Sequence, residues 1–305
     1  MKKNLTAALW GAFYADAYSL GTHWIYDPQQ IAEAKLDATR LHDPMCKYHP
    51  GKSAGDFTHY GDQMLWLLAE LAESRDFEIE KFAARWQQEM KQYKGYIDGA
   101  SKHTHSALKA GGSATTCGSN SHDFSVVGRM MPLIYALDEE QLSRSIESHT
   151  NFTHQTPDLV ASARYFHQLI AAVSEGAEIK QTIRDITSSY PENIQAWVKK
   201  GLAQVGREPV VAITTLGPAC GVEGCFASVI YLLQSFDGFQ AAMEANVKAG
   251  GDSAARGLVV GATLGACGGM SSLPANLADM NKTGEIKKLM EVIAKRASSE
   301  DSGHE

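Results

Sequence analysis

Apolar residues recur at helical spacing in segment after segment of this 305-residue chain, and no run alternates apolar and polar positions convincingly enough to predict a sheet. The pattern therefore predicts an all-α protein. The expected helices cover about residues 5–20, 61–74, 77–94, 126–137, 139–149, 157–174, 179–187, 191–204, 209–216, 222–235, 238–248 and 252–267.

Two long stretches, at about residues 37–60 and 98–125, lack this periodicity and are rich in Gly, Ser, Thr, His and Asp. Loops of this length in a compact domain are usually functional or mobile. Nothing in the composition resembles a linker between domains, and no long period indicates a solenoid. We expect one domain over residues 1–297, followed by a frayed polar tail over residues 298–305.

The net charge of −7 and the pI near 5.9 argue against a nucleic-acid partner, which needs clustered Lys and Arg on one face. A small or phosphorylated ligand stays compatible with this charge, because a local pocket can be positive inside an acidic protein. The expected partner is therefore a small molecule. The oligomeric state is left open.

The first residues imitate a secretory signal, with Met1-Lys2-Lys3, an apolar run and Ala15-Asp16-Ala17 in place of a cleavage site. Asp16 argues against export, since an acidic residue is unwelcome just before cleavage. No stretch approaches the ~20 apolar residues of a membrane helix. Five cysteines without a CxxC pair fit a reducing compartment. We expect a cytoplasmic protein that does not bind membranes.

Three junctions between a loop and a helix could carry chemistry. Residues 55–63 contain Asp56 and Asp62 and run into an apolar helix, with Asp62 where a helix cap would stand. Residues 250–256 contain Gly250 and Gly251 before Asp252, a pair that lets the backbone turn sharply and present a carboxylate to a cleft. An ordinary cap is the alternative for each carboxylate.

The third junction, residues 151–158, contains His154 between two amphipathic helices. His154 could be a base or an orienting group, and a hydrogen-bonded structural histidine is the alternative. The pairs His103-Thr104-His105 and His122-Asp123 lack the i, i+4 spacing of a zinc pair on a helix, which argues against zinc.

Four segments resemble landmarks of the ADP-ribosylglycohydrolase family, in the family's order. Residues 8–21 resemble its GxxxGxAxGDALG opening. Ser119-Asn120-Ser121 with residues 128–132 resembles its GNG…MR…P stretch, and Thr153-His154 with Pro157 resembles its T-H…P turn. Gly250 to Ser253, followed by Gly257 and Gly261, resembles its GGDTDT helix. The resemblance covers most of the chain and implies an orthogonal multi-helix bundle.

The resemblance also implies a cleft with two magnesium ions between a T-D-D-T turn and the GGDTDT turn. Against T-D-D-T the chain offers Tyr60-Gly61-Asp62-Gln63, and against the end of GGDTDT it offers Ala254 and Ala255, which have no ligand oxygen. Magnesium prefers several oxygen ligands. Asp62 and Asp252 are thus the expected ligands of at most one weakly bound magnesium ion. This pattern is similar to the branch that contains the J-type crystallins and selenoprotein J.

Arg256 stands four residues after Asp252 on the same expected helix face. If Asp62 and Asp252 face each other across one cleft, their like charges need compensation. We hypothesise that the Arg256 guanidinium takes over part of the metal's electrostatic role, with an ordinary surface pair as the alternative.

The function implied by the resemblance is hydrolysis of an ADP-ribosyl or related N- or O-glycosidic bond. The expected catalytic residues are Asp62, Asp252 and His154; the expected substrate-binding residues are Asp16, Asp56, Asn120, Arg129, Ser253 and Arg256. Two alternatives remain: a protein of the same fold that binds ADP-ribose-like ligands or serves a crystallin-like structural role without catalysis, and a helical interaction scaffold. Catalytic activity is therefore left open.

Overall fold

The computed structural model describes residues 3–301, and within them the chain is helical with no strand. Two isolated bridges, Ser119 to His154 and Asp123 to Gly221, are the β-type pairings in this part. The predicted all-α class is confirmed. Among the described helices, none combines the length and the apolar character that a membrane-spanning segment needs.

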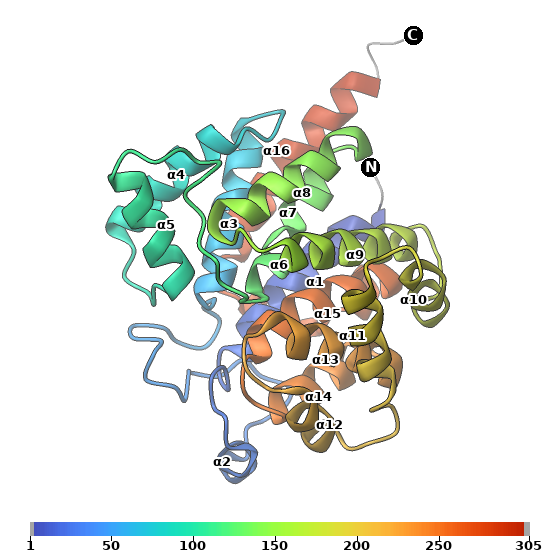
Figure 1. Cartoon of the computed structure of the whole chain (residues 1–305). Coiled ribbons are helices and arrows are strands. Elements are labelled where there is room, and N and C mark those ends of the chain that lie inside the picture. Colours follow the sequence, from blue (N-terminus) through green and yellow to red (C-terminus); the bar gives the residue numbers. More distant parts are fainter. Residues whose placement is uncertain (1–2, 302–305) are drawn as a thin grey trace.

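Two helices at the centre, α1 (Lys3–Ser19) and α15 (Ser253–Gly268), pack against each other along their lengths (Figure 1). Their backbones approach closely because glycines face each other. A Cβ atom on Gly261 would collide with the carbonyl oxygen of Gly11, and one on Gly265 would collide with that of Ala7. The glycines that recur along α15 therefore serve helix packing.

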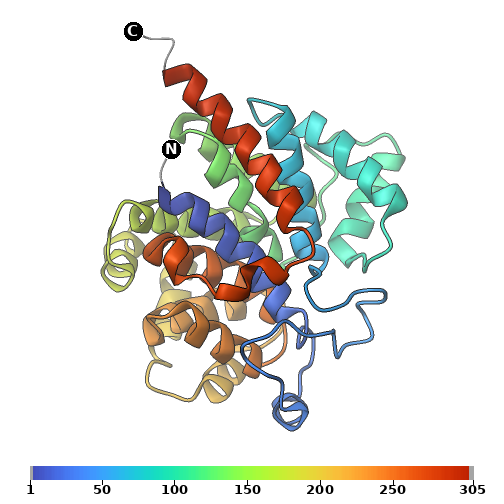
Figure 2. The same ribbon diagram turned by 180° about the vertical axis from the view of Figure 1, so that it is seen from behind.

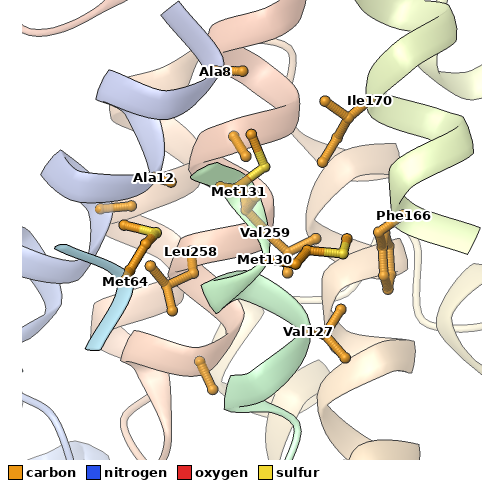
Figure 3. Close-up of a cluster of buried hydrophobic side chains, with 14 of the residues drawn as sticks. Ala8, Ala12, Met64, Val127, Met130, Met131, Phe166, Ile170, Leu258 and Val259 are labelled. Atoms are coloured by element: carbon orange, nitrogen blue, oxygen red, sulfur yellow. The ribbon is translucent and has the colours of Figure 1, made fainter. Parts of the chain in front are cut away.

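The main core surrounds this pair. Figure 3 shows Leu258 and Val259 of α15 among side chains from α6 (Ser125–Arg129), α7 (Met131–Ala136) and α9 (Pro157–Ser174), including Met131 and Phe166. The expected helix over 126–137 is divided at Met130. Pro132 stands two residues later, in the first turn of α7, and its ring nitrogen has no proton to donate to the preceding turn.

Most expected helices are present. They are α3 (His59–Glu73), α4 (Ile79–Gln92), α8 (Glu139–Thr153), α10 (Ile179–Thr187), α11 (Glu192–Leu202), α12 (Pro209–Leu216), α13 (Val222–Ser235) and α14 (Phe239–Lys248).

Several helices lie outside the expected ranges. The short helices α2 (Pro28–Ala34) and α5 (Gly99–Lys109) bury few residues, so they show little apolar periodicity. Two 3-10 turns, η1 (Met270–Ser272) and η2 (Ala275–Asp279), follow α15. The chain then forms α16 (Thr283–Asp301), which packs along α3 (Figure 2). Residues 298–301 of the expected frayed tail are thus helical, and residues 302–305 lie outside the described part.

Candidate functional site

Asp252 stands at the start of α15, after a sharp turn made by two glycines. Gly250 and Gly251 have φ angles of 69° and 64°, which glycine adopts without steric cost. The Asp252 carboxylate accepts a hydrogen bond from the Ala255 N–H at 3.1 Å, so the expected acidic cap is confirmed. The turn is paired with the segment after α1, because Gly251 N–H donates to the Ile25 carbonyl at 2.7 Å.

Two further groups donate hydrogen bonds to the buried Asp252 carboxylate. Nε2 of His23 lies 3.0 Å from Oδ1, and the Tyr60 hydroxyl lies 3.0 Å from Oδ2. Nδ1 of His23 lies 2.9 Å from Nε2 of His49, so the two imidazole rings form a hydrogen-bonded chain that ends at Asp252. Burial alone would raise the pKa of Asp252, but the hydrogen bond and charge of His23 outweigh it and hold the pKa below its usual range.

Asp123 and Cys220 lie beside Asp252, with one ligand-type atom of each residue within 4.8 Å of the others. Asp123 accepts from the Ser125 N–H at 2.8 Å at the start of α6, and the Cys220 carbonyl accepts from the Phe124 N–H at 2.8 Å. Burial, together with the nearby charges of Asp252 and Asp98, raises the pKa of Asp123 to about 7. Burial and the two carboxylates also raise the pKa of the Cys220 thiol to about 12.

A pocket of about 720 Å³ opens at this cluster, and we call it the aromatic pocket. Four aromatic side chains, two carboxylates and a thiol share its wall with small polar residues. The lining residues are Trp24, Tyr26, Tyr48, Tyr96, Asp98, Gly99, Ala100, His103, Ser119, Ser121, Asp123 and Cys220. Asp98 is also the cap of α5, because it accepts from the Ser101 N–H at 2.8 Å.

Asp62 does not share this pocket. Its carboxylate accepts from Lys52 Nζ at 2.5 Å and from the Tyr93 hydroxyl at 2.6 Å, and it lines a different pocket together with Asp56. Burial raises the pKa of Asp62, while Lys52 and Tyr93 lower it in part. The expectation that Asp62 and Asp252 face each other across one cleft is therefore wrong. Asp62 is paired with Lys52 in a separate pocket.

The structure also places Tyr60, and not Asp62, against Asp252. Thr58, not Asp62, is the cap of α3, since its hydroxyl accepts from the Tyr60 N–H at 3.1 Å. Tyr60 then contacts Asp252, while Nε2 of the buried His59 lies 3.6 Å from Oδ2 of Asp98. The first turn of α3 thus brings Tyr60 to Asp252 and His59 to Asp98, whereas Asp62 lies elsewhere.

Asp16 is buried and connects α1 to the start of α3. It accepts hydrogen bonds from the Thr58 N–H at 2.8 Å and from the Thr58 hydroxyl at 2.7 Å. Burial raises its pKa to about 7, although both hydrogen bonds lower the pKa in part. These contacts give Asp16 a structural task next to the turn that carries Tyr60. The apolar run that imitates a secretory signal lies in α1, and its side chains are buried.

Arg129 and His154 form a second buried polar group. Arg129 donates to the Gln63 side chain and, at 3.0 Å, to the Thr153 hydroxyl. Nδ1 of His154 lies 2.7 Å from the same hydroxyl, and burial together with the Arg129 charge lowers the pKa of His154 to about 3. His154 is therefore neutral, and neither residue is part of the aromatic pocket's lining.

The remaining predicted residues lie apart. Asn120 is exposed on the loop before α6. Ser253 is buried, and its carbonyl accepts from Ser19 and Asn246. The buried Arg256 guanidinium donates to Asn246 Oδ1 at 2.8 Å and to the Gly250 carbonyl at 2.5 Å, so it fixes the turn before α15. Its charge lowers the pKa of Asp252, but the direct bond to that carboxylate comes from His23.

The residues around Asp252 do not fit the pair of magnesium ions that the family implies. Magnesium requires near-octahedral oxygen ligands. The residue of α3 that contacts Asp252 is Tyr60, which is not a carboxylate, and the Asp252 oxygens already accept from His23, Tyr60 and Ala255. The remaining potential ligands, Asp123 and Cys220, include a thiol, which is a poor partner for this hard ion.

The residues that line the site were mostly missed from the sequence. Asp98 and Cys220 carry no local motif, and Trp24 lies in a segment without periodicity. Asp123 stands in the pair His122-Asp123, which was considered only for zinc. A usable signal was Thr58, whose hydroxyl suits a helix cap and which would have placed His59 and Tyr60 in the first turn of α3.

The comparisons with known proteins agree with this fold. The family model described as ADP-ribosylglycohydrolase matches residues 1–303. Crystallin J1A of Tripedalia cystophora is 22% identical over 96% of this chain and 97% of its own length, and crystallin J1B of the same animal is 22% identical over 90% and 91%. A solved structure titled ADP-ribosylglycohydrolase-related protein complex superposes with a TM-score of 0.78 at 17% identity, over 96% of this chain and 98% of its own. The chain belongs to the ADP-ribosylglycohydrolase family.

Proposed function

We propose that this chain hydrolyses a glycosidic bond in the aromatic pocket, using carboxyl groups as acid and base in place of a magnesium pair. The observation that carries the proposal is the presence of Asp98 and Asp123 in one pocket wall, with the pKa of Asp123 raised to about 7. Two carboxyl groups with different protonation are what glycoside hydrolysis requires.

In this reaction the protonated Asp123 donates its proton to the leaving atom as the glycosidic bond breaks. A water molecule forms the new bond to the anomeric carbon, and its proton passes to the Asp98 carboxylate. The products are the free sugar and the protonated leaving group. Asp98 then loses its proton to solvent, and Asp123 regains one, which restores the starting state.

Asp252 is a positioning residue in this scheme. His23 and Tyr60 hold it as an anion, and its negative charge keeps the proton of Asp123 in place. The aromatic rings of Trp24 and Tyr96 would stack on the apolar face of a sugar or on its leaving group.

The test is an incubation of the purified chain, in EDTA, with alkyl glycosides, whose leaving alcohol needs a proton, and with ADP-ribosylated peptides. We expect release of product that EDTA does not suppress and that falls at least ~100-fold in Asp123→Asn, because a positioned acid contributes about 10² to 10⁴ to the rate. Turnover that requires added Mg²⁺, or that survives Asp123→Asn, would overturn the proposal.

A second candidate is a crystallin-like protein that binds a ligand without hydrolysis. The contact of Tyr60, which is not a carboxylate, with Asp252 favours it, as does the similarity to two proteins named crystallins. Under this alternative, ligands stabilise the protein against heat but no glycoside in the panel is consumed.

A further inference from the structure

We infer that a second cavity binds a neutral small molecule with a hydrocarbon body and one hydrogen-bonding group. The cavity lies between α2, the segment that follows α2, and the helices α12 and α14, and its volume is about 390 Å³. We call it the α2 cavity. Its lining residues differ from those of the aromatic pocket, so this site is separate from the one proposed for hydrolysis.

The wall of the α2 cavity contains hydrocarbon side chains from several elements. Ile31 of α2 and Leu36 line it on one side of the sequence, and Val210 of α12 and Val247 of α14 line it from the other. All four are buried or half-buried. The volume lies within the range of about 300 to 1,000 Å³ that is usual for small-molecule sites. Because apolar walls gain dispersion contacts with an apolar molecule between them, this wall suits a hydrocarbon body.

One buried polar group belongs to a lining residue and has no partner within the protein. Thr22 lines the cavity and is only 2% exposed. Among the residues that the structure describes, none forms a hydrogen bond with its hydroxyl. A buried hydroxyl without a hydrogen bond is unfavourable, and nearly all such groups in proteins have a partner. The Thr22 hydroxyl therefore supplies the hydrogen bond that a polar group on the ligand would complete.

The charges around the cavity favour a neutral ligand. The charged lining residues are two lysines and two carboxylates, so they balance. Three of them, Lys35, Asp37 and Lys248, are exposed to solvent. The fourth, Glu244, lies 3.5 Å from Lys248 Nζ. A charged ligand would lose its hydration without gaining a buried partner of opposite charge.

Hydrogen bonds hold the wall in place around the cavity. The Ala38 carbonyl accepts from the Tyr18 hydroxyl at 2.9 Å and from the Gln240 side-chain amide at 2.6 Å. Asp27 caps the start of α2 by accepting from the Gln29 N–H at 2.9 Å. The helix α2 itself lies at the edge of the helix bundle (Figure 1). A ligand thus meets a preformed wall and needs little rearrangement to bind.

The experiment measures binding of 1-octanol by titration calorimetry at several temperatures. We expect 1-octanol to bind with a negative change in heat capacity, because binding buries apolar surface. Octanoate and octylammonium have the same chain length but carry a charge. As competitors, each ion should displace 1-octanol at least about tenfold less well than the neutral 1-heptanol does, because the ion must lose its hydration.

Ala32→Phe places a ring in the cavity from an exposed position of α2, and it should weaken 1-octanol binding at least about tenfold. Ala34→Phe is the matched control, because Ala34 is exposed in the same helix but is not part of the cavity lining. This control should bind 1-octanol like the wild type. Circular dichroism checks that both variants fold.

Thr22→Val removes the hydroxyl and nearly keeps the shape of the side chain. It should weaken 1-octanol binding about three- to tenfold, which corresponds to the loss of one hydrogen bond. Without ligand, this variant should melt at the temperature of the wild type or higher, because the hydroxyl has no hydrogen bond within the protein to lose.

The inference is overturned if 1-octanol does not bind, if either ion displaces it as well as 1-heptanol does, or if Ala34→Phe weakens binding as much as Ala32→Phe. An unchanged affinity for 1-octanol in Thr22→Val would overturn the assigned hydrogen bond. None of these outcomes depends on glycoside turnover, so a failure of this inference is distinguishable from a failure of the proposed function.

Discussion

Asp252 carries its negative charge inside the protein because three donors converge on one carboxylate. His23, Tyr60 and the Ala255 N–H each lie within 3.1 Å of its oxygens. A buried anion left with one donor fewer is costly, since the lost hydrogen bond is not replaced by water. The stability of the fold is therefore tied to the side chains that hold Asp252 beside Asp123 and Cys220.

Tyr60→Phe tests this dependence. Loss of a hydrogen bond to a buried charge should lower the free energy of unfolding by about 1–3 kcal/mol. Tyr165→Phe is the control, because its hydroxyl pairs with the neutral Thr187 hydroxyl at 3.0 Å and its loss should cost about 1 kcal/mol. Urea unfolding of both variants measures the difference, and an equal loss in the two would contradict a charged Asp252.

Asp123 makes the stability depend on pH in a defined direction. Its pKa is about 7 in the folded state, mainly through burial, whereas an unfolded aspartate titrates near its ordinary value of 3.8. Between about pH 4 and 7 the folded state holds a proton that the unfolded state has lost, so stability from this group falls as pH rises, by up to about 1.4 kcal/mol per pH unit.

Asp123→Asn removes this proton exchange. The free energy of unfolding of the wild type relative to the variant should therefore decrease steadily from pH 4 to pH 7. Urea unfolding at a series of pH values measures the difference. A difference that stays constant or grows over this window would show that Asp123 is ionised in the folded protein.

The sequence predicted Asp252 and its glycine turn because two adjacent glycines before an acidic cap form a local signal. It did not predict the residues opposite, because Tyr60, Asp123 and Cys220 meet Asp252 only through packing of distant segments. Asp62 looked equivalent to Asp252 along the chain, yet Lys52 and Tyr93 bind it in another pocket. The sequence thus predicted features set by neighbouring residues, but not which distant residues contact each other in the fold.

At the level of elements, the contact between α1 and α15 sets the position of the site, because α15 begins at Asp252 and α1 leads to His23. Gly261→Ala should place a methyl group against the Gly11 carbonyl and lower the free energy of unfolding by about 1–3 kcal/mol or more. Thermal unfolding followed by circular dichroism measures the loss.

Gly284→Ala is the matched control for that substitution. Gly284 lies in α16, and an added Cβ there meets no atom within 4 Å. Alanine is the better helix former by up to about 1 kcal/mol, so this variant should be as stable as the wild type or more so. Equal destabilisation of both variants would mean that the glycine contact between α1 and α15 is loose.

The helices that the sequence predicted are those with a broad apolar face, such as α9 and α13. The helix α5 was assigned to an irregular stretch because its buried residues, Ala100, Ser101 and Thr104, are small or polar. Its start is nevertheless fixed by the Asp98 cap, which also lines the aromatic pocket. The elements next to the site were thus the hardest to predict, since function rather than burial sets their composition.

At the level of the whole molecule, the family fold is kept, and we propose that the ligands of its metal centre are replaced. Addition of millimolar Mg²⁺ should leave the melting temperature unchanged, because a ligand stabilises only a state that binds it. The melting temperature of Arg256→Ala should likewise be the same with and without added Mg²⁺. A rise of several degrees with Mg²⁺ in the wild type would contradict this replacement.

The most direct test compares glycoside turnover in Asp123→Asn and Asp62→Asn, with folding of both variants checked by circular dichroism. If the chemistry lies in the aromatic pocket, Asp123→Asn loses at least ~100-fold in kcat and Asp62→Asn keeps the turnover of the wild type. Loss of turnover in Asp62→Asn together with full activity in Asp123→Asn would contradict the account and return the reaction to the pocket of Lys52 and Tyr93.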